Sequence, residues 1–252
     1  MRITLTLKLL LLLLTVLPPI IFAQSRQIPT SPAQLPFIVE KMERAQAQVK
    51  IPNHVKRDYR LSRANSATVD SEVIAEIDFR APGSYTIEKH SGSSLGAQLV
   101  KRVLEHEVGM AVSSQKSGSA AVTRENYLFG YLGEAVLDGQ SYYLLRLDPK
   151  RKQPELIAGQ AWVDKQSFLI RRIEGDVKSP SVWVKKIHIR FDFNFDNPRQ
   201  MWVLANMEAV ADVRFLGARK LTSQVLDYET ASVVAKKIGA VAPSASAVLL
   251  RK

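Results

Sequence analysis

The sequence predicts a mainly β protein: a curved, antiparallel, half-open β-barrel of about ten strands with two covering helices. Apolar and polar residues alternate in many short segments, so each predicted strand has one apolar face. Turn residues such as Asp138-Gly139 separate these segments. Only two long stretches have helical spacing. Two helices cannot cover both sides of such a sheet, so the sheet must curl around its own apolar face.

Residues 1–23 have the plan of a secretory signal peptide. Basic residues precede an apolar run from Leu9 to Phe22, and Ala23 is a small residue at which a signal peptidase could cut. A retained membrane anchor is the alternative. The apolar run contains Pro18-Pro19 and is shorter than the roughly 20 residues that span a bilayer, so cleavage is favoured.

The rest of the chain divides into three parts. Residues 24–35 are a flexible linker rich in Pro, Ser and Gln, residues 36–228 form a single domain, and residues 229–252 form a flexible, basic tail rich in Ala and Ser. The 252 residues include no cysteine, so an exported protein must depend on its core rather than on disulfides, which suits the bacterial periplasm.

The formal charge of +11 favours anionic lipid headgroups or an acidic partner, or is simply a solvated basic surface. Nucleic acid is not expected, because the basic residues are not interleaved with aromatic ones. We expect a monomer.

The first half of the domain begins with a helix over Pro36–Lys50, where apolar residues share one stripe. Strands follow over Val55–Arg63 and Glu72–Arg80, and after a turn at Ala81-Pro82-Gly83 a return strand begins at Tyr85. The second helix is predicted from Leu95 to about Val112, after a Gly/Ser segment that can cap it.

The second half is a meander of strands from Tyr127 to about Asp196, followed by strands over Val203–Phe215 and Leu221–Tyr228. The segment 187–195 alternates regularly, with Ile and Phe at its odd positions. The polar residues His188, Arg190, Asp192 and Asn194 fall on its other face.

Strand 203–215 has small side chains on its apolar face, three of them alanine. Small residues can leave room for a dry cavity that could hold a lipid chain. The alternative, which this strand alone favours slightly, is that a helix packs closely on the alanines. The candidate ligand-binding residues of a hydrophobic cavity are Val73, Ile77, Phe79, Leu99, Val103, Ile189, Phe191, Phe193, Ala205, Met207, Ala209, Ala211 and Val213.

Little in the sequence indicates catalysis. Residues 92–96 match G-x-S-x-G between a strand and a helix, which would place Ser94 as a hydrolase nucleophile. The preceding strand is half polar, unlike the apolar strand before such a nucleophile, so a helix cap is the simpler interpretation. The histidines at 54, 90, 106 and 188 lack ligand spacing, and we expect no metal site and no cofactor.

Three segments carry a resemblance to a known family. They are Tyr143–Lys150 (YLLRLDPK), Gly159–Lys165 (GQAWVDK) and Leu169–Gly175. The pattern resembles the periplasmic outer-membrane lipoprotein-sorting (LolA-like) group, and the following residues to Trp183 look like a divergent branch of it. The resemblance covers roughly residues 120–228. It implies a half-open antiparallel barrel of the LolA/LolB kind that holds acyl chains in its concave cavity.

These observations give three hypotheses. The first is a non-enzymatic periplasmic carrier of a lipid or a lipoprotein acyl chain, exchanging cargo with a membrane-associated donor or acceptor protein. The second is a module of the same fold that senses lipid or a protein partner, like the N-terminal domain of RseB. The third is a serine hydrolase at Ser94.

Overall fold

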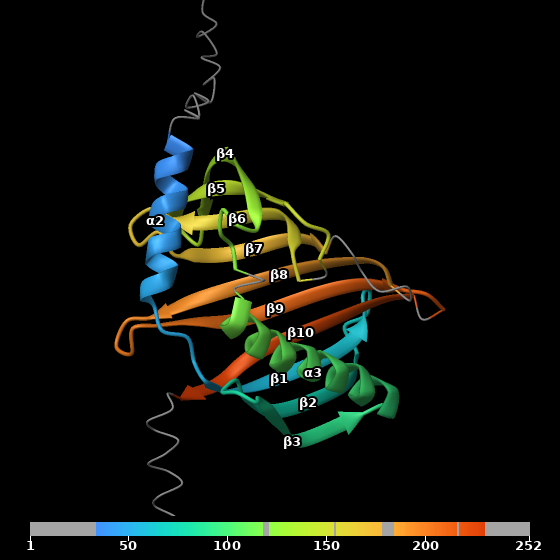
Figure 1. The fold of residues 1–252 in the computed structure, drawn as a ribbon. Coiled ribbons are helices and arrows are strands. Elements are labelled where there is room, and N and C mark those ends of the chain that lie inside the picture. The colour runs from blue at the N-terminus through green and yellow to red at the C-terminus, as the bar shows by residue number, and fades with distance from the viewer. Residues whose placement is uncertain (1–33, 118–120, 154, 178–183, 216, 230–252) are drawn as a thin grey trace, which may run out of the picture. The chain divides into compact units, whose positions relative to one another are not determined.

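The structure is a computed structural model and describes residues 34–117, 121–153, 155–177, 184–215 and 217–229, with side chains left out for 110–117. The described residues form two helices and ten strands (Figure 1). Their bounds are α2 Leu35–Gln48, β1 His54–Arg63, β2 Val69–Asp78, β3 Ser84–Gly92, α3 Ser94–Ser117, β4 Tyr127–Leu137, β5 Gln140–Pro149, β6 Ile157–Asp164, β7 Ile170–Val177, β8 Val184–Asp196, β9 Met201–Val213 and β10 Gly217–Glu229.

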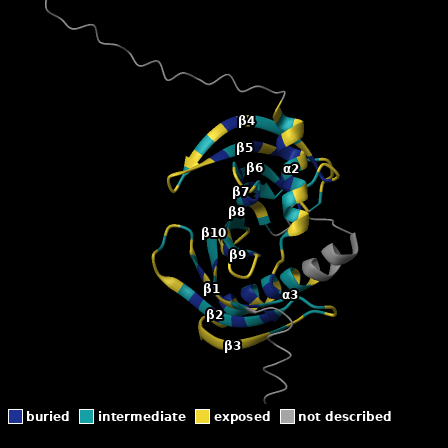
Figure 2. Cartoon of the chain, turned by 90° about the vertical axis from the view of Figure 1, so that its left-hand side faces the viewer, coloured by how far each residue is buried: buried dark blue, intermediate teal, exposed yellow. Residues whose placement is uncertain are grey.

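All ten strands belong to one antiparallel sheet, in the order β3-β2-β1-β10-β9-β8-β7-β6-β5-β4. Neighbours in this order are also neighbours in the chain, except β1 and β10, which pair from His54–Glu229 to Arg63–Arg219. The sheet stays open at β3 and β4. Figure 2 shows it curving into an arc, with both helices on its inner side. The predicted mainly β, half-open antiparallel architecture is confirmed.

Local sequence signals explain several elements. Asp138 (φ 52°) and Gly139 (φ 77°) form the hairpin turn between β4 and β5, as the Asp-Gly pair predicts. β3 runs on to Gly92, and α3 is longer than the predicted helix. At this junction the Ser93 hydroxyl accepts a hydrogen bond from the Gly96 amide at 3.1 Å, which caps α3.

The interior is divided into two hydrophobic cores. The α2 core joins that helix to strands β4–β7, with Met42, Leu145 and Ala161 fully buried. The α3 core joins that helix to β1 and β2, with Tyr59, Val73 and Leu104 fully buried. Each helix therefore stabilises one end of the arc.

The outer face of the sheet is polar, as the alternation predicts. One cross-strand row of its residues pairs across eight strands, and the row consists of Arg146, Gln160, Glu174, Arg190, Glu208, Thr222, Arg60 and Glu72. Ion pairs link several strands, including Lys220–Glu208 at 2.7 Å and Arg172–Asp192 at 2.6 Å. This face is suited to water.

The glycine pair Gly159 and Gly175 lies side by side on β6 and β7. A Cβ on Gly175 would lie 2.3 Å from the Ala158 carbonyl oxygen, and one on Gly159 would lie 2.0 Å from that of Glu174. The two backbones approach too closely for any other residue. Glycines at such points let a sheet bend sharply.

The predicted signal peptide (residues 1–23) lies outside the described residues, as do most of the predicted linker and the tail; Leu35 begins α2 and Glu229 ends β10. Within the described ranges, no helix has the length and apolar character needed to cross a membrane.

Candidate functional site

The candidate site is the inner face of the central strands β8 and β9, between the two helices. Ile187, Ile189 and Phe191 of β8 pair directly with Ala211, Ala209 and Met207 of β9. Side chains opposite each other in a ladder point to the same face, so these six form one continuous apolar strip. On the β10 side the strip continues to Leu221, the partner of Ala209.

The predicted cavity residues fall into three groups. Val73 and Ile77 are fully buried in the α3 core, Phe79 and Val103 pack against it, and Leu99 is half-buried on α3. A second group, Ile189, Phe191 and Phe193, packs against the α2 core. The third group lies on β9, where Ala205 and Met207 are buried and Ala209, Ala211 and Val213 are half-buried.

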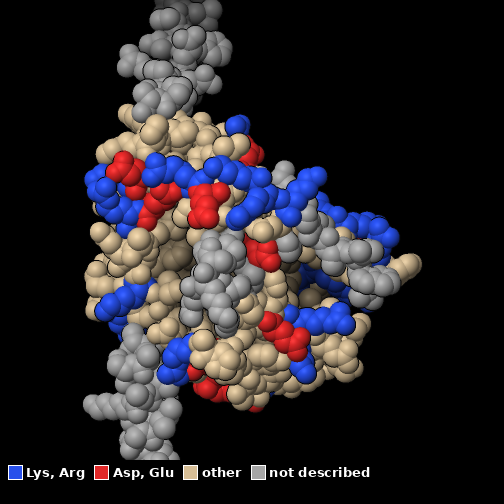
Figure 3. Space-filling model, in the orientation of Figure 1, with Lys and Arg blue, Asp and Glu red and all other residues tan. Residues whose placement is uncertain are grey.

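The alanines Ala209 and Ala211 of β9 stand apart from both hydrophobic cores. Among the described residues, Ala209, Ala211 and Val213 belong to neither core. The main contacts of α3 with the sheet fall on β1–β3, and α2 contacts β4. In Figure 3, which views this side, Lys, Arg, Asp and Glu form a band across the upper part of the molecule, and uncharged surface is visible below that band on the left.

Four polar side chains meet the inner face beside the strip. The Arg57 guanidinium is 3% exposed and donates to the Leu204 carbonyl at 2.9 Å and to the Ser223 hydroxyl at 3.4 Å. The Tyr59 hydroxyl donates to Glu107 Oε2 of α3 at 2.9 Å. The guanidinium group of Arg57 and the hydroxyl group of Tyr59, both on β1, thus lie where α3, β9 and β10 meet.

This environment changes the proton affinity of the two acidic groups. Burial raises the pKa of Glu107, while Arg57, the Tyr59 hydrogen bond and His106 act in the opposite direction. Burial also raises the pKa of Tyr59, and the carboxylate of Glu107 adds to that rise. Glu107 therefore holds its proton more tightly than an exposed glutamate does.

Sequence reasoning did not identify these residues, although a signal was present. Arg57 is two positions from Val55 and from Tyr59, so the period of a strand puts it on the apolar face. Glu107 follows Leu104 by three residues, so it falls on the buried stripe of its helix. Polar residues on an apolar face are the informative exceptions.

The hydrolase hypothesis finds little support at Ser94. The serine does follow a strand and begin a helix, as the motif predicts. However, β3 is an antiparallel edge strand, whereas a nucleophile elbow follows an internal parallel strand. Ser94 is exposed, and the neighbouring Ser93 has the capping role.

His188 is engaged on the outer face of the sheet. Its Nδ1 lies 2.9 Å from Asp176 and its Nε2 lies 3.2 Å from Glu174. Those contacts raise the pKa of His188, chiefly through the hydrogen bond with Asp176. Within the described part of the chain, no group of His, Asp and Glu side chains is arranged to hold a metal ion.

Comparison with known proteins gives structural likenesses alone. No family model matches the sequence, and no curated protein matches it. A domain named as an outer membrane lipoprotein-sorting protein from Vibrio parahaemolyticus is similar at 11% identity and a TM-score of 0.41, covering 77% of this chain and 92% of that one. A DUF1329 family protein from Desulfovibrio piger is similar at 12% identity and a TM-score of 0.40, covering 80% of this chain and 95% of that one.

A third solved structure, a LolA superfamily protein from Nitrosomonas europaea, has 13% identity and a TM-score of 0.36, covering 77% of this chain and 92% of that one.

Proposed function

We propose that the protein binds a lipid or a lipoprotein acyl chain against the inner face of β8 and β9 and carries it through the periplasm toward the outer membrane. The observation that supports this most is the apolar strip between the two cores. Its members Ile187, Ala209 and Ala211 are half-buried, so apolar surface remains available there. The resemblance of residues 143–175 to the lipoprotein-sorting group points to the same role.

The energetics of such binding follow from the strip. Burying an acyl chain contributes about 0.8 kcal/mol for each methylene removed from water. Ala209 and Ala211 have small side chains, and we propose that they leave room above the sheet that larger side chains would fill. No chemical step is needed for this function, and the protein is proposed to act without catalysis.

Loading and release require the helices to give access to the strip. The α3 helix contacts β1–β3, and Tyr59 and Glu107 join it to the sheet at 2.9 Å. Movement of α3 away from β1 would uncover more of the inner face of the sheet. We propose α3 as the element that moves.

Ala209→Trp tests the site directly. The indole would occupy the space of the acyl chain, so we expect the affinity for a fluorescent fatty acid to fall at least about tenfold, equivalent to 1.4 kcal/mol. Val210→Trp is the matched control, because the adjacent residue points to the outer face beside His188 and Lys220. Equal affinity in the two variants would refute binding on this strip.

Native mass spectrometry of protein purified from a bacterial periplasm, followed by extraction, would identify a bound phospholipid or acylated peptide. A carrier should release a labelled lipid to acceptor vesicles when the acceptor protein is present. The sensor hypothesis predicts that the protein retains the same lipid under those conditions.

A further inference from the structure

The turn between β9 and β10 presents a fully exposed aromatic ring. Phe215 is 94% exposed, more than any other large apolar residue in the described part of the chain. Figure 1 shows this turn at the right-hand end of the two strands, at the margin of the molecule. We call this the hairpin end of the sheet, where β8 and β10 begin and β9 and β1 end.

The backbone of Phe215 is also unusual. Its φ is +68°, in the left-handed region that Gly and Asn adopt most readily and that a bulky residue adopts at a cost. Asn at this position would suit both the dihedral angle and the solvent. A residue that contradicts two local preferences at once indicates a role outside the stability of the fold.

Arginines border the apolar strip at the hairpin end. Ala211 of β9 pairs with Ile187 on one side and with Arg219 of β10 on the other. Arg219 pairs in turn with Arg63 of β1. Residues paired in this way share a face of the sheet, so both guanidinium groups start from the inner face beside the end of the strip.

Positive charge is in excess around the turn. The cations there are Arg63, Lys185, Lys186, Arg214 and Arg219, and the carboxylates that pair with them at 3.0–3.5 Å are Asp70, Asp176 and Asp212. Arg63 and Arg214 are exposed and form no ion pair within the described residues. Figure 3, in the orientation of Figure 1, shows Lys and Arg gathered along this side of the molecule.

We propose that the hairpin end docks on an anionic lipid bilayer, with Phe215 inserted among the headgroups and Arg63 and Arg214 beside the lipid phosphates. Such a surface buries an apolar ring and attracts the cations around it, which is the combination that the turn offers. A protein interface needs a broad apolar core, and a single projecting ring does not supply one.

This inference rests on the proposed carrier function for its purpose. The strip reaches the hairpin end with the pair Ile187–Ala211, two residues before β9 ends at Val213. A bilayer in contact with the turn would therefore lie at the end of the strip. An acyl chain could then pass between membrane and strip with little exposure to water.

Sedimentation with phosphatidylglycerol vesicles tests the docking, using protein purified from a bacterial periplasm. We expect Phe215→Asn to weaken vesicle binding at least about fivefold, because the inserted ring is lost. Arg63→Gln and Arg214→Gln should each weaken it about fivefold, and added salt should weaken binding of the wild type. Phosphatidylcholine vesicles should bind the wild type less.

Matched controls lie at the opposite end of the strands. They are Ile51→Asn, at a residue that is 64% exposed, and Lys50→Gln, at an exposed residue whose backbone bridges to Met201 at the start of β9. Both controls should bind vesicles as the wild type does. Thermal melting should show no loss of stability in Phe215→Asn, since Asn suits the left-handed φ.

The affinity for a fluorescent fatty acid separates docking from the carrier function. Phe215→Asn should keep the wild-type affinity while it loses vesicle binding. Wild-type protein that takes up fatty acid and does not sediment with vesicles would overturn the docking alone. Equal losses in the control variants, or equal binding to both kinds of vesicle, would also overturn it. Vesicle binding that depends on Phe215 in a protein unable to take up fatty acid would support the docking and refute the carrier function.

Discussion

On α3, Glu107 turns its carboxyl toward β1, where the hydroxyl of the fully buried Tyr59 donates to it. Burial raises the pKa of Glu107 above its ordinary value of 4.5. A carboxyl whose pKa is raised on folding stabilises the fold in its protonated form. That contribution is complete below the unfolded pKa and is lost as the pH rises through the folded one.

Glu107→Gln should therefore stabilise the protein at neutral pH. The amide keeps a hydrogen bond to Tyr59 and cannot ionise, so we expect the free energy of unfolding at pH 7 to rise by about 1 kcal/mol. The gain should vanish near pH 4, where wild-type Glu107 is protonated. Urea denaturation across this range measures it.

Glu105→Gln is the control, because this neighbouring carboxylate is exposed on the same helix. A gain at Glu107 that stays the same from pH 4 to pH 7 would mean that ionisation is not its cause.

At the scale of elements, the junction of β3 and α3 depends on Gly92. Its φ is +90°, and a Cβ there would lie 2.3 Å from the Asp70 carbonyl oxygen. That oxygen also accepts the Ser93 amide. The edge strand and the helix that follows it are thus fixed by one backbone conformation.

We predict that Gly92→Ala lowers the free energy of unfolding by about 3 kcal/mol, since both the dihedral strain and the clash act. Gly139→Ala separates the two effects, because Gly139 has φ +77° and nothing within 4 Å of its Cβ position. The Gly139→Ala variant should lose only about 1 kcal/mol of the free energy of unfolding, because only the dihedral strain acts there. Thermal or chemical denaturation that finds equal losses would contradict a steric role for Asp70.

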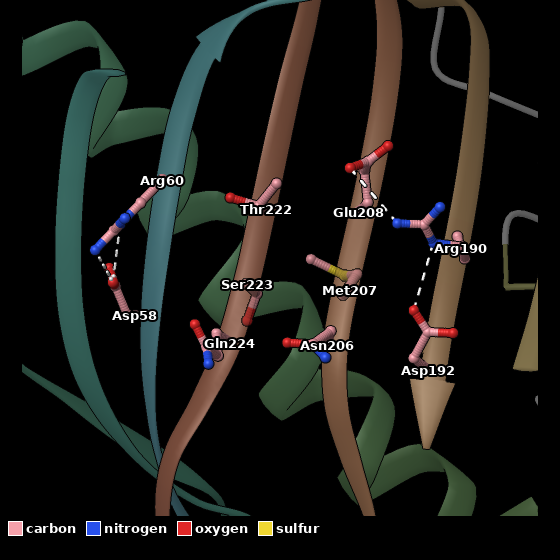
Figure 4. A pocket seen from close by; sticks show the side chains of 10 residues that line it. All are labelled: Asp58, Arg60, Arg190, Asp192, Asn206, Met207, Glu208, Thr222, Ser223 and Gln224. Carbon is pink, nitrogen blue, oxygen red and sulfur yellow. Dashed lines mark hydrogen bonds and ion pairs between the residues drawn. The ribbon is translucent and has the colours of Figure 1, made fainter. Parts of the chain in front are cut away.

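The elements themselves were largely predictable. Strict alternation in β2 and β8 and the Asp138-Gly139 turn gave the strands, and helical spacing gave α2 and α3. Their pairing irregularities were not predictable, since a register shift depends on neighbours distant in sequence. Nor was the polar hollow beside Asp58 and Gln224 on the outer face predicted (Figure 4), because four strands distant in sequence bring its side chains together. The predicted cavity residues of the inner face remain a prediction.

At the scale of the whole sheet, two cores lie at the two ends of the arc. The α3 core contains β1 and β2, and the α2 core contains strands from β4 to β7. The β9–β10 ladder connects the two halves of the sheet, and it runs from the pair Val213–Gly217 to the pair Asn206–Gln224. We expect each half to respond separately to damage in its own core.

Leu104→Ala and Leu145→Ala test this division. Both leucines are fully buried, one in each core, and each substitution should lower stability by about 2–5 kcal/mol. Hydrogen exchange should rise mostly in α3, β1 and β2 for the first and mostly in α2, β5 and β6 for the second. Equal acceleration throughout the sheet in both variants would show that the halves unfold together.

The strands β3 and β4 follow each other in the chain, yet they form the two opposite edges of the sheet. The segment between them, which includes α3, must therefore cross the whole open side. A single break in that crossing would divide the chain into one fragment with α2 and β1–β3 and another with β4–β10. The pairing of β1 with β10 and the packing of α2 on the second fragment would still join the two. The fold can thus be regarded as two fragments that fit each other. If the chain is split at that point, we expect the two fragments to reassemble, and their reassembly could be used to report that they have met.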